Sequence, residues 1–131
     1  MEDVKEIPYG FSNFVEVMRQ NMYYVDKTPY LPLLESQPRN LFLIRPRRFG
    51  KSIFLSMMSA YYDIARKDEF NELFGNLWIG SHPTRLQGTY QIMSFDFSRA
   101  SAGMGALEEN FNAYCAICID AFAQKYAAWY E

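Results

Sequence analysis

The sequence lacks the features that would place it in a membrane, in a secretion pathway or on bare nucleic acid. No apolar run approaches the ~20 residues that a membrane-spanning helix needs. The start, Met1 to Glu6, has no basic region leading into an apolar stretch, as a signal peptide would. A formal net charge of −2 argues against a general nucleic-acid-binding domain. We therefore expect a cytoplasmic protein that makes no membrane contact.

Cysteine and histidine are also scarce. The two cysteines, Cys115 and Cys118, form a C-x-x-C pattern. A redox pair would open a helix after a strand, whereas this pair lies inside a helical pattern. Zinc would need two more ligands, and the one histidine, His82, has no carboxylate or cysteine near it in sequence. We expect buried helical thiols and assign His82 no catalytic role.

What the sequence does contain is apolar and aromatic. Of 131 residues, 50% are hydrophobic and 18% are aromatic, which indicates one folded domain with a sizeable core. We expect this single domain, 1–131, to comprise an N-terminal helical segment (1–39), a strand, loop and helix (40–66), and a second strand with a C-terminal helix (67–131).

One stretch carries chemistry. Leu41 to Ile44 is an apolar run of strand length, a basic turn follows, and Gly50-Lys51-Ser52 opens a segment of helical spacing. A strand, a phosphate loop and a helix in this order are typical of a P-loop. Lys51 would neutralise the β and γ phosphates of ATP, and the Ser52 hydroxyl would hold Mg²⁺.

The backbone of this loop would bind the phosphates through successive N–H groups, with glycine where a side chain would block the approach. The predicted nucleotide-binding residues are Pro46, Arg47, Arg48, Phe49, Gly50, Lys51 and Ser52. One position departs from the G-x-x-x-x-G-K-[ST] pattern, because Arg45 replaces the first glycine. In addition, Pro46 has no N–H to donate. A basic surface turn is the alternative interpretation.

The run Arg45 to Ser52, with Tyr24-Val-Asp-Lys-Thr28 before it, resembles the AAA-ATPase-like family of bacterial proteins. In that family arginine is the usual residue at the position of Arg45. Phe74 to Ile79 and Ile92 to Ser98 also resemble family segments. The resemblance implies that Tyr24, Val25 and Asp26 lie near the adenine base. It also implies a Walker B strand and often a PD-(D/E)XK nuclease-like domain in longer relatives, neither of which follows in this sequence.

Local signals predict the remaining elements. We expect a strand at Tyr90–Phe97, with Asp96 as a structural or capping residue rather than a Walker B carboxylate. The region Gly80 to Thr89 is expected to be a loop. Helices are predicted after the caps Ser12, Thr28 and Asp68, along the face that carries Phe54, Leu55, Met57, Met58, Tyr61, Tyr62 and Ala65, and over Ala106 to Tyr130.

These elements predict an α/β fold, a partial P-loop NTPase of the three-layer α/β/α type that lacks the Walker B strand. The missing strand should separate the two predicted ones, so we expect self-association through an exposed sheet edge or a swapped C-terminal helix. We expect ATP binding with absent or very slow hydrolysis, the complete family member being an ATPase. Two alternatives stay open: contacts from Arg45, Arg47, Arg48 and Lys51 to nucleic-acid phosphates, or a structural fragment with a vestigial P-loop.

Overall fold

The computed structural model describes residues 4–37, 39–42, 44, 51–96 and 107–130, which fall into two compact units. Unit 1 is Met1–Tyr90 and unit 2 is Gln91–Glu131. Each unit is described by itself.

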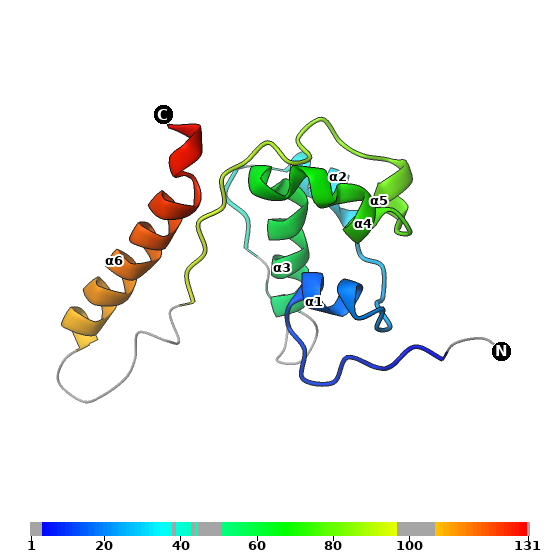
Figure 1. Ribbon diagram of the computed structural model, residues 1–131, viewed down its shortest axis with the longest axis horizontal. Coiled ribbons are helices and arrows are strands. Elements are labelled where there is room, and N and C mark those ends of the chain that lie inside the picture. Colours follow the sequence, from blue (N-terminus) through cyan, green and yellow to red (C-terminus); the bar gives the residue numbers. More distant parts are fainter. Residues whose placement is uncertain (1–3, 38, 43, 45–50, 97–106, 131) are drawn as a thin grey trace. The chain divides into compact units, whose positions relative to one another are not determined.

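Unit 1 is a small helical assembly around α3 (Lys51–Tyr62). Figure 1 shows α1 lying across the N-terminal half of α3, and the Phe14 N–H at the start of α1 donates to Ser56 Oγ at 2.9 Å. Helix α3 continues into a 3-10 helix, η1, and the short α4 packs against α1, η1 and α5. The other elements of this unit are α1 (Phe14–Arg19), α2 (Tyr30–Glu35), η1 (Ile64–Glu69), α4 (Phe70–Phe74) and α5 (Trp78–Ser81).

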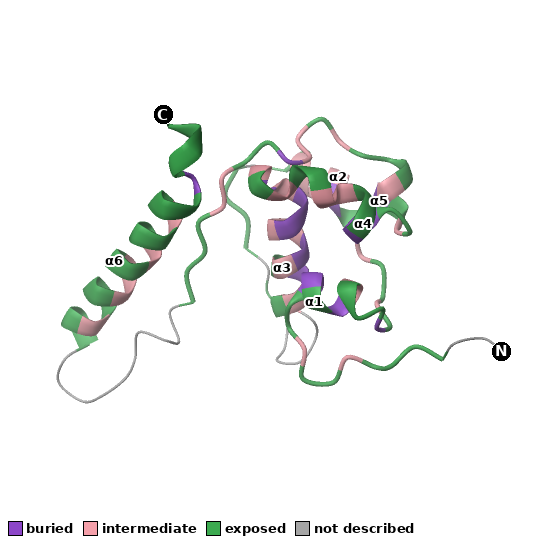
Figure 2. Ribbon diagram, in the orientation of Figure 1, coloured by how far each residue is buried: buried purple, intermediate pink, exposed green. Residues whose placement is uncertain are grey.

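The core of unit 1 lies between α3 and the short helices (Figure 2). The predicted inner face of α3 is confirmed at Phe54, Met57 and Tyr61, which are buried, whereas Leu55 is exposed. Aromatic rings join the helices: Phe14 of α1 stacks on Phe74 of α4 with centroids 4.9 Å apart. Tyr61 of α3 also packs edge-on against Phe74, with centroids 5.5 Å apart. Such ring pairs add to the burial of apolar area and join α1, α3 and α4.

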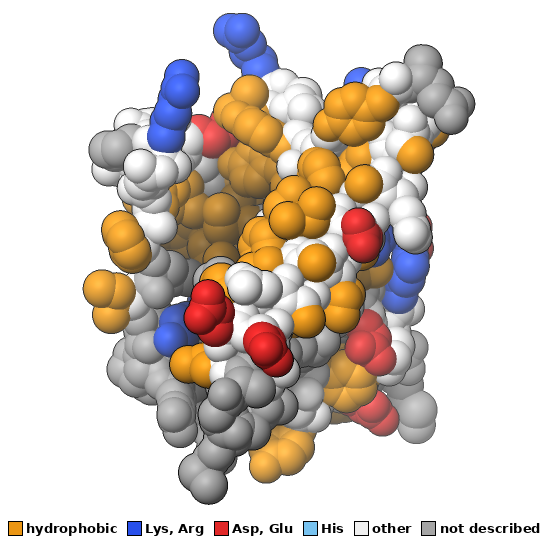
Figure 3. All heavy atoms as spheres, turned by 90° about the vertical axis from the view of Figure 1, so that its left-hand side faces the viewer, with side chains coloured by type: hydrophobic (Ala, Val, Ile, Leu, Met, Phe, Trp, Pro, Cys, Tyr) orange, Lys and Arg blue, Asp and Glu red, His pale blue; other side chains and the backbone are white. Residues whose placement is uncertain are grey.

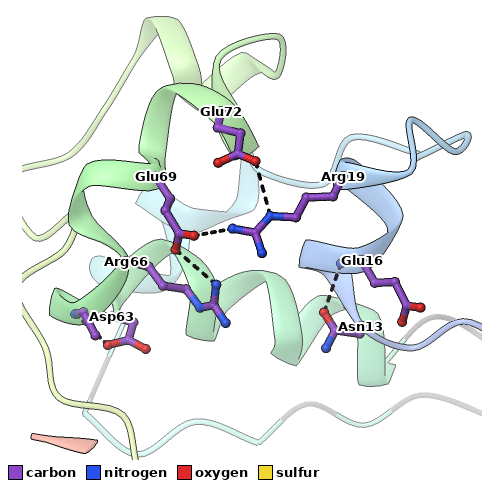
Figure 4. A network of polar contacts seen from close by, with 8 residues as sticks. Asn13, Glu16, Arg19, Asp63, Arg66, Glu69 and Glu72 are labelled. Carbon is purple, nitrogen blue, oxygen red and sulfur yellow. Dashed lines mark hydrogen bonds and ion pairs between the residues drawn. The ribbon is translucent and has the colours of Figure 1, made fainter.

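An ion-pair network ties the same helices together at the surface (Figure 4). Arg19 at the end of α1 pairs with Glu69, and its Nε lies 3.2 Å from Glu72 Oε1. Arg66 Nη1 lies 3.1 Å from the other oxygen of Glu69. These two arginines are therefore engaged by carboxylates and do not form an anion site.

The predicted helices are present, but α5 was not predicted and lies partly in the expected loop Gly80 to Thr89, and the caps differ. Asn13, not Ser12, caps α1, and its side chain accepts from the Glu16 N–H at 3.2 Å. Helix α2 starts at Tyr30 with Pro29 as its N-cap, because the Thr28 hydroxyl faces another partner. Asp63 caps η1 through the Ala65 N–H, whereas Asp68 lies inside η1 and does not cap α4.

The predicted α/β three-layer fold is wrong for the part of the chain that the structure describes, which is helical and contains no strand. Leu41, Phe42 and Ile44 have no regular structure and are exposed. Residues 91–96 are likewise irregular, and the described β pairing is one isolated bridge, between Asp63 and Tyr90. A strand is stable when neighbouring strands pair with its backbone and other elements pack on its faces. Apolar content by itself was therefore not enough to make these segments strands.

Unit 2 consists of residues 91–96, α6 (Leu107–Lys125) and η3 (Ala127–Trp129), which confirms the predicted long helix apart from its last turn. Tyrosine hydroxyls fasten residues 91–96 to this helical segment. The Ile92 N–H donates to Tyr126 Oη at 2.8 Å, and the Asp96 N–H donates to Tyr114 Oη at 2.6 Å. These side-chain hydroxyls thus accept backbone hydrogen bonds that the carbonyl groups of a neighbouring strand would accept in a sheet. Across the described ranges of both units, every helix is too short or too polar to cross a membrane.

Candidate functional site

The predicted phosphate loop meets the described structure at the first turn of α3. Arg45 and the predicted binding residues Pro46, Arg47, Arg48, Phe49 and Gly50 lie outside the described residues. Lys51 and Ser52 are the first two residues of α3, as the sequence predicts, with Lys51 half-buried and Ser52 exposed. The first N–H groups of a helix lack intrahelical acceptors and carry the positive end of the dipole. No acidic residue lies in this first turn, so the potential there stays favourable for an anion.

A cavity of about 480 Å³ lies beside this turn. Ile53 and Phe54 of α3, which directly follow Lys51 and Ser52, form one side of it. The segment after α1 contributes a further wall, and the N-terminal arm adds Ile7 and Pro8. The lining residues are Ile7, Pro8, Tyr23, Tyr24, Val25, Lys27, Ile53 and Phe54. This size and apolar character suit a small organic ligand, and Lys27 supplies one positive charge.

The cavity brings together two parts of the chain that the sequence analysis named separately. Tyr24 and Val25, implied by resemblance to lie near an adenine base, line the same space as the two residues after Ser52. The backbone holds this wall in place, since the Tyr23 N–H donates to Glu6 O at 2.8 Å. The Tyr24 ring packs edge-on against Phe14, with centroids 5.1 Å apart.

The Tyr24 hydroxyl is held in its neutral form. Burial raises its pKa to about 12, an effect that the Lys27 backbone partly opposes and the Asp26 carboxylate reinforces. Its oxygen is buried and makes no hydrogen bond of good geometry with any described residue. The ring therefore presents an apolar face and an uncharged hydroxyl beside the cavity.

Asp26, the third residue implied near the base, is not among the described residues that line the cavity. Its Oδ1 accepts from the Thr28 N–H at 2.9 Å and from the Thr28 hydroxyl at 2.6 Å. Its Oδ2 accepts from the Trp78 N–H at 2.7 Å, and Thr28 Oγ1 accepts from the Ile79 N–H at 3.2 Å. Asp26 and Thr28 thereby cap α5 from a distant part of the chain, because the N-cap of α5, Leu77, has no capping side chain.

The remaining candidates are not among the residues that line the cavity. The His82 ring stacks on Trp78, with centroids 4.4 Å apart, and its Nδ1 lies 3.0 Å from Trp78 O. Cys115 and Cys118 are free and half-buried on α6, so they are helical thiols as predicted but less buried than expected. No cluster of three metal-ligating side chains occurs among the residues for which the structure gives positions. Asp96 is exposed.

Sequence reasoning missed Ile7, Pro8, Tyr23, Lys27, Ile53 and Phe54 as cavity residues. Apart from Lys27, these residues share only their apolarity, which in a sequence indicates core as readily as a cavity lining. The role of Asp26 and Thr28 was detectable in part, because an Asp two residues before a Thr favours a local turn through the carboxylate. Its distant partner, α5, could not be read from the local pattern.

Comparison with known proteins gives one family and one relative. The sequence profile of the family described as "Predicted AAA-ATPase" matches residues 8–130. An "Uncharacterized protein in vnfD 5'region" from Azotobacter chroococcum mcd 1 is 41% identical over 59 residues. That match spans 44% of this chain and 11% of the relative, so the chain covers a small part of the relative's length. No solved structure matches the chain.

Proposed function

The chain belongs to the predicted AAA-ATPase family, and we propose that it binds ATP with Mg²⁺ through a variant Walker A loop that ends at Lys51 and Ser52. Lys51 would neutralise the terminal phosphates, and the Ser52 hydroxyl would be a ligand of Mg²⁺. The backbone from Pro46 to Gly50 would complete the phosphate site.

The observation that carries this proposal is the cavity beside the first turn of α3. A nucleotide needs a site for its phosphates and an apolar site for its base within one ligand length of each other. The start of α3 supplies the first, through N–H groups that have no acceptor within the helix and through the cation Lys51. The cavity supplies the second, because Ile53 and Phe54 follow Ser52 directly and line it together with Tyr24 and Val25.

Catalysis is a separate matter from binding. Hydrolysis needs a positioned water and charge stabilisation at the transferred phosphoryl group, in addition to a bound Mg²⁺. We assign Ser52 to the metal and name no residue as the water-positioning group. We therefore propose nucleotide binding with slow or absent turnover for this chain.

The deciding experiment is calorimetric titration of ATP with Mg²⁺ into the wild type, Lys51→Ala and Lys67→Ala. Lys67 is an exposed lysine on η1, so its replacement removes the same charge away from the cavity. We expect Lys51→Ala to weaken binding by roughly tenfold to a hundredfold, the loss of one charge-assisted hydrogen bond. Lys67→Ala should bind as the wild type does.

Two further ligands separate the phosphate site from the cavity. Inorganic triphosphate should bind the wild type and Val25→Asn alike, whereas adenosine should bind Val25→Asn more weakly. Equal ATP affinity in wild type and Lys51→Ala would refute the proposal. Binding to single-stranded DNA with a steep salt dependence, indifferent to Mg²⁺ and ATP, would instead favour the nucleic-acid alternative.

A further inference from the structure

We propose that Asp26 and Thr28 are positioning residues that couple the cavity to α5, so that ligand binding in the cavity and docking of α5 stabilise each other. The segment Tyr23–Thr28 has two sides with different tasks. Tyr23, Tyr24, Val25 and Lys27 line the cavity, whereas Asp26 and Thr28 hold the first two N–H groups of α5. The inference rests on the proposed nucleotide site and adds a means by which that site is shaped.

The geometry leaves the segment little freedom while α5 is docked. The Asp26 carboxylate accepts three hydrogen bonds, two from Thr28 and one from the Trp78 N–H. Thr28 is fully buried, and its hydroxyl both donates to Asp26 and accepts from the Ile79 N–H. Ile79 is itself fully buried in the core cluster. A change in the wall of the cavity therefore has to move, or break, bonds to a helix that is anchored in the core.

The coupling runs in both directions by thermodynamic necessity. If docked α5 holds the wall in the shape that binds the ligand, then the ligand must favour docked α5. Trp78 is the first residue of α5, and its exposed ring stacks on His82. The fluorescence of Trp78 therefore reports on the docking of α5. Loss of the Thr28 hydroxyl should weaken ligand binding even though Thr28 does not line the cavity.

The test uses the full chain with Trp129→Phe, so that Trp78 is its one tryptophan. ATP with Mg²⁺ is titrated into this background and into the same background with Thr28→Val, Thr28→Ser, Asp26→Asn or Ser36→Ala. Binding is followed by calorimetry and by Trp78 fluorescence. Ser36→Ala is the matched control, because it removes a hydroxyl that bonds Leu33 O at the exposed end of α2.

We expect a saturable change in Trp78 fluorescence with the same midpoint as the calorimetric titration. Thr28→Val and Asp26→Asn should weaken binding by about tenfold, the equivalent of one ordinary hydrogen bond, and shrink the fluorescence change. Thr28→Ser keeps the hydroxyl and should therefore retain the affinity and the fluorescence change of the background protein. Ser36→Ala should alter neither of these two quantities. Heat release without any response of Trp78, or unchanged affinity in Thr28→Val and Asp26→Asn, would overturn the proposal.

A measurement without ligand keeps this inference separate from the proposed function. In Asp26→Asn, which preserves side-chain shape, amide hydrogen exchange should accelerate together at Trp78 and Ile79 and at Tyr23 in the cavity wall. Faster exchange in α5 with an unchanged Tyr23 amide would refute the coupling whether or not ATP binds. Coupled acceleration in a protein that fails to bind ATP would leave the coupling standing and refute the nucleotide site.

Discussion

At the scale of single residues, Tyr24 is the clearest case of a polar group held without a strong partner. Its hydroxyl oxygen is buried and makes no good hydrogen bond within the described part of the chain. Replacing it removes at most a weak contact with the Lys27 backbone, so Tyr24→Phe should change the free energy of unfolding at neutral pH by less than about 0.5 kcal/mol. Urea unfolding followed by circular dichroism measures this, and a loss as large as that of a buried apolar truncation would contradict it.

The same substitution should flatten the loss of stability at alkaline pH. The pKa of Tyr24 rises from 10.0, its value in an unfolded chain, to about 12 in the folded protein. Between these values the unfolded state releases the proton first, so stability is full below pH 10 and falls as the pH rises to about 12. The free energy of unfolding of Tyr24→Phe should fall less steeply with pH over this range. If its pH dependence stayed parallel to that of the wild type, the raised pKa would be disproved.

The caps show how far single residues can be predicted. Ser12 and Asn13 are neighbours of the same capping class, and nothing in their residue types favours Asn13 over Ser12 as the cap. Thr28 had the right type for a cap, but its hydroxyl is used by Asp26 and by α5, fifty residues further along the chain. Residue type predicted that these positions would accept hydrogen bonds, whereas the identity of the donor depended on the fold.

At the scale of elements, helices were predictable because their signals are local. The spacing of Phe54, Met57 and Tyr61 encodes the buried face of α3 without reference to any other segment. The predicted strands failed because a strand's partners are distant, and residues 91–96 are fastened by tyrosine hydroxyls instead. The cavity was unpredictable for the same reason, since Ile7 and Phe54 meet only in the folded chain.

The contact between α1 and α4 allows a prediction about surface charge. Arg19 pairs with Glu69 and Glu72, but the side chains of these three residues are 46%, 30% and 57% exposed, so water screens the attraction. Arg19→Ala should lower the free energy of unfolding by less than about 1 kcal/mol, since the packing of Phe14 on Phe74 holds the helices.

Urea unfolding at low and high salt tests this, with Arg85→Ala, an exposed arginine on the loop after α5, as the control. The difference between wild type and Arg19→Ala should shrink at high salt, because screening weakens the pairs. A large loss that is independent of salt would mean that Arg19 contributes through buried packing and not through charge.

At the scale of the whole molecule, the surface of α6 is unusually apolar. Figure 3 shows hydrophobic side chains along this helix, and Ile117 and Ile119 are 66% and 50% exposed. Of the tyrosines that bond residues 91–96, Tyr114 lies in α6 and Tyr126 follows its last residue. Exposed apolar area of this kind favours association. The other surface expected to associate was a sheet edge. That expectation no longer applies, because the described residues contain no strand.

We therefore predict that the chain self-associates through α6, as the expected swapping or pairing of the C-terminal helix requires. Sedimentation velocity should show a rise in mean mass with protein concentration, and Ile117→Lys with Ile119→Lys should shift the protein towards monomer. The matched control, Ala113→Lys with Ala116→Lys, adds the same two charges at exposed positions of the same helix but removes no large apolar side chain. If both double variants dissociate equally, charge repulsion drives the change and the isoleucines are not the contact. If the wild type is monomeric at every concentration, α6 does not mediate self-association.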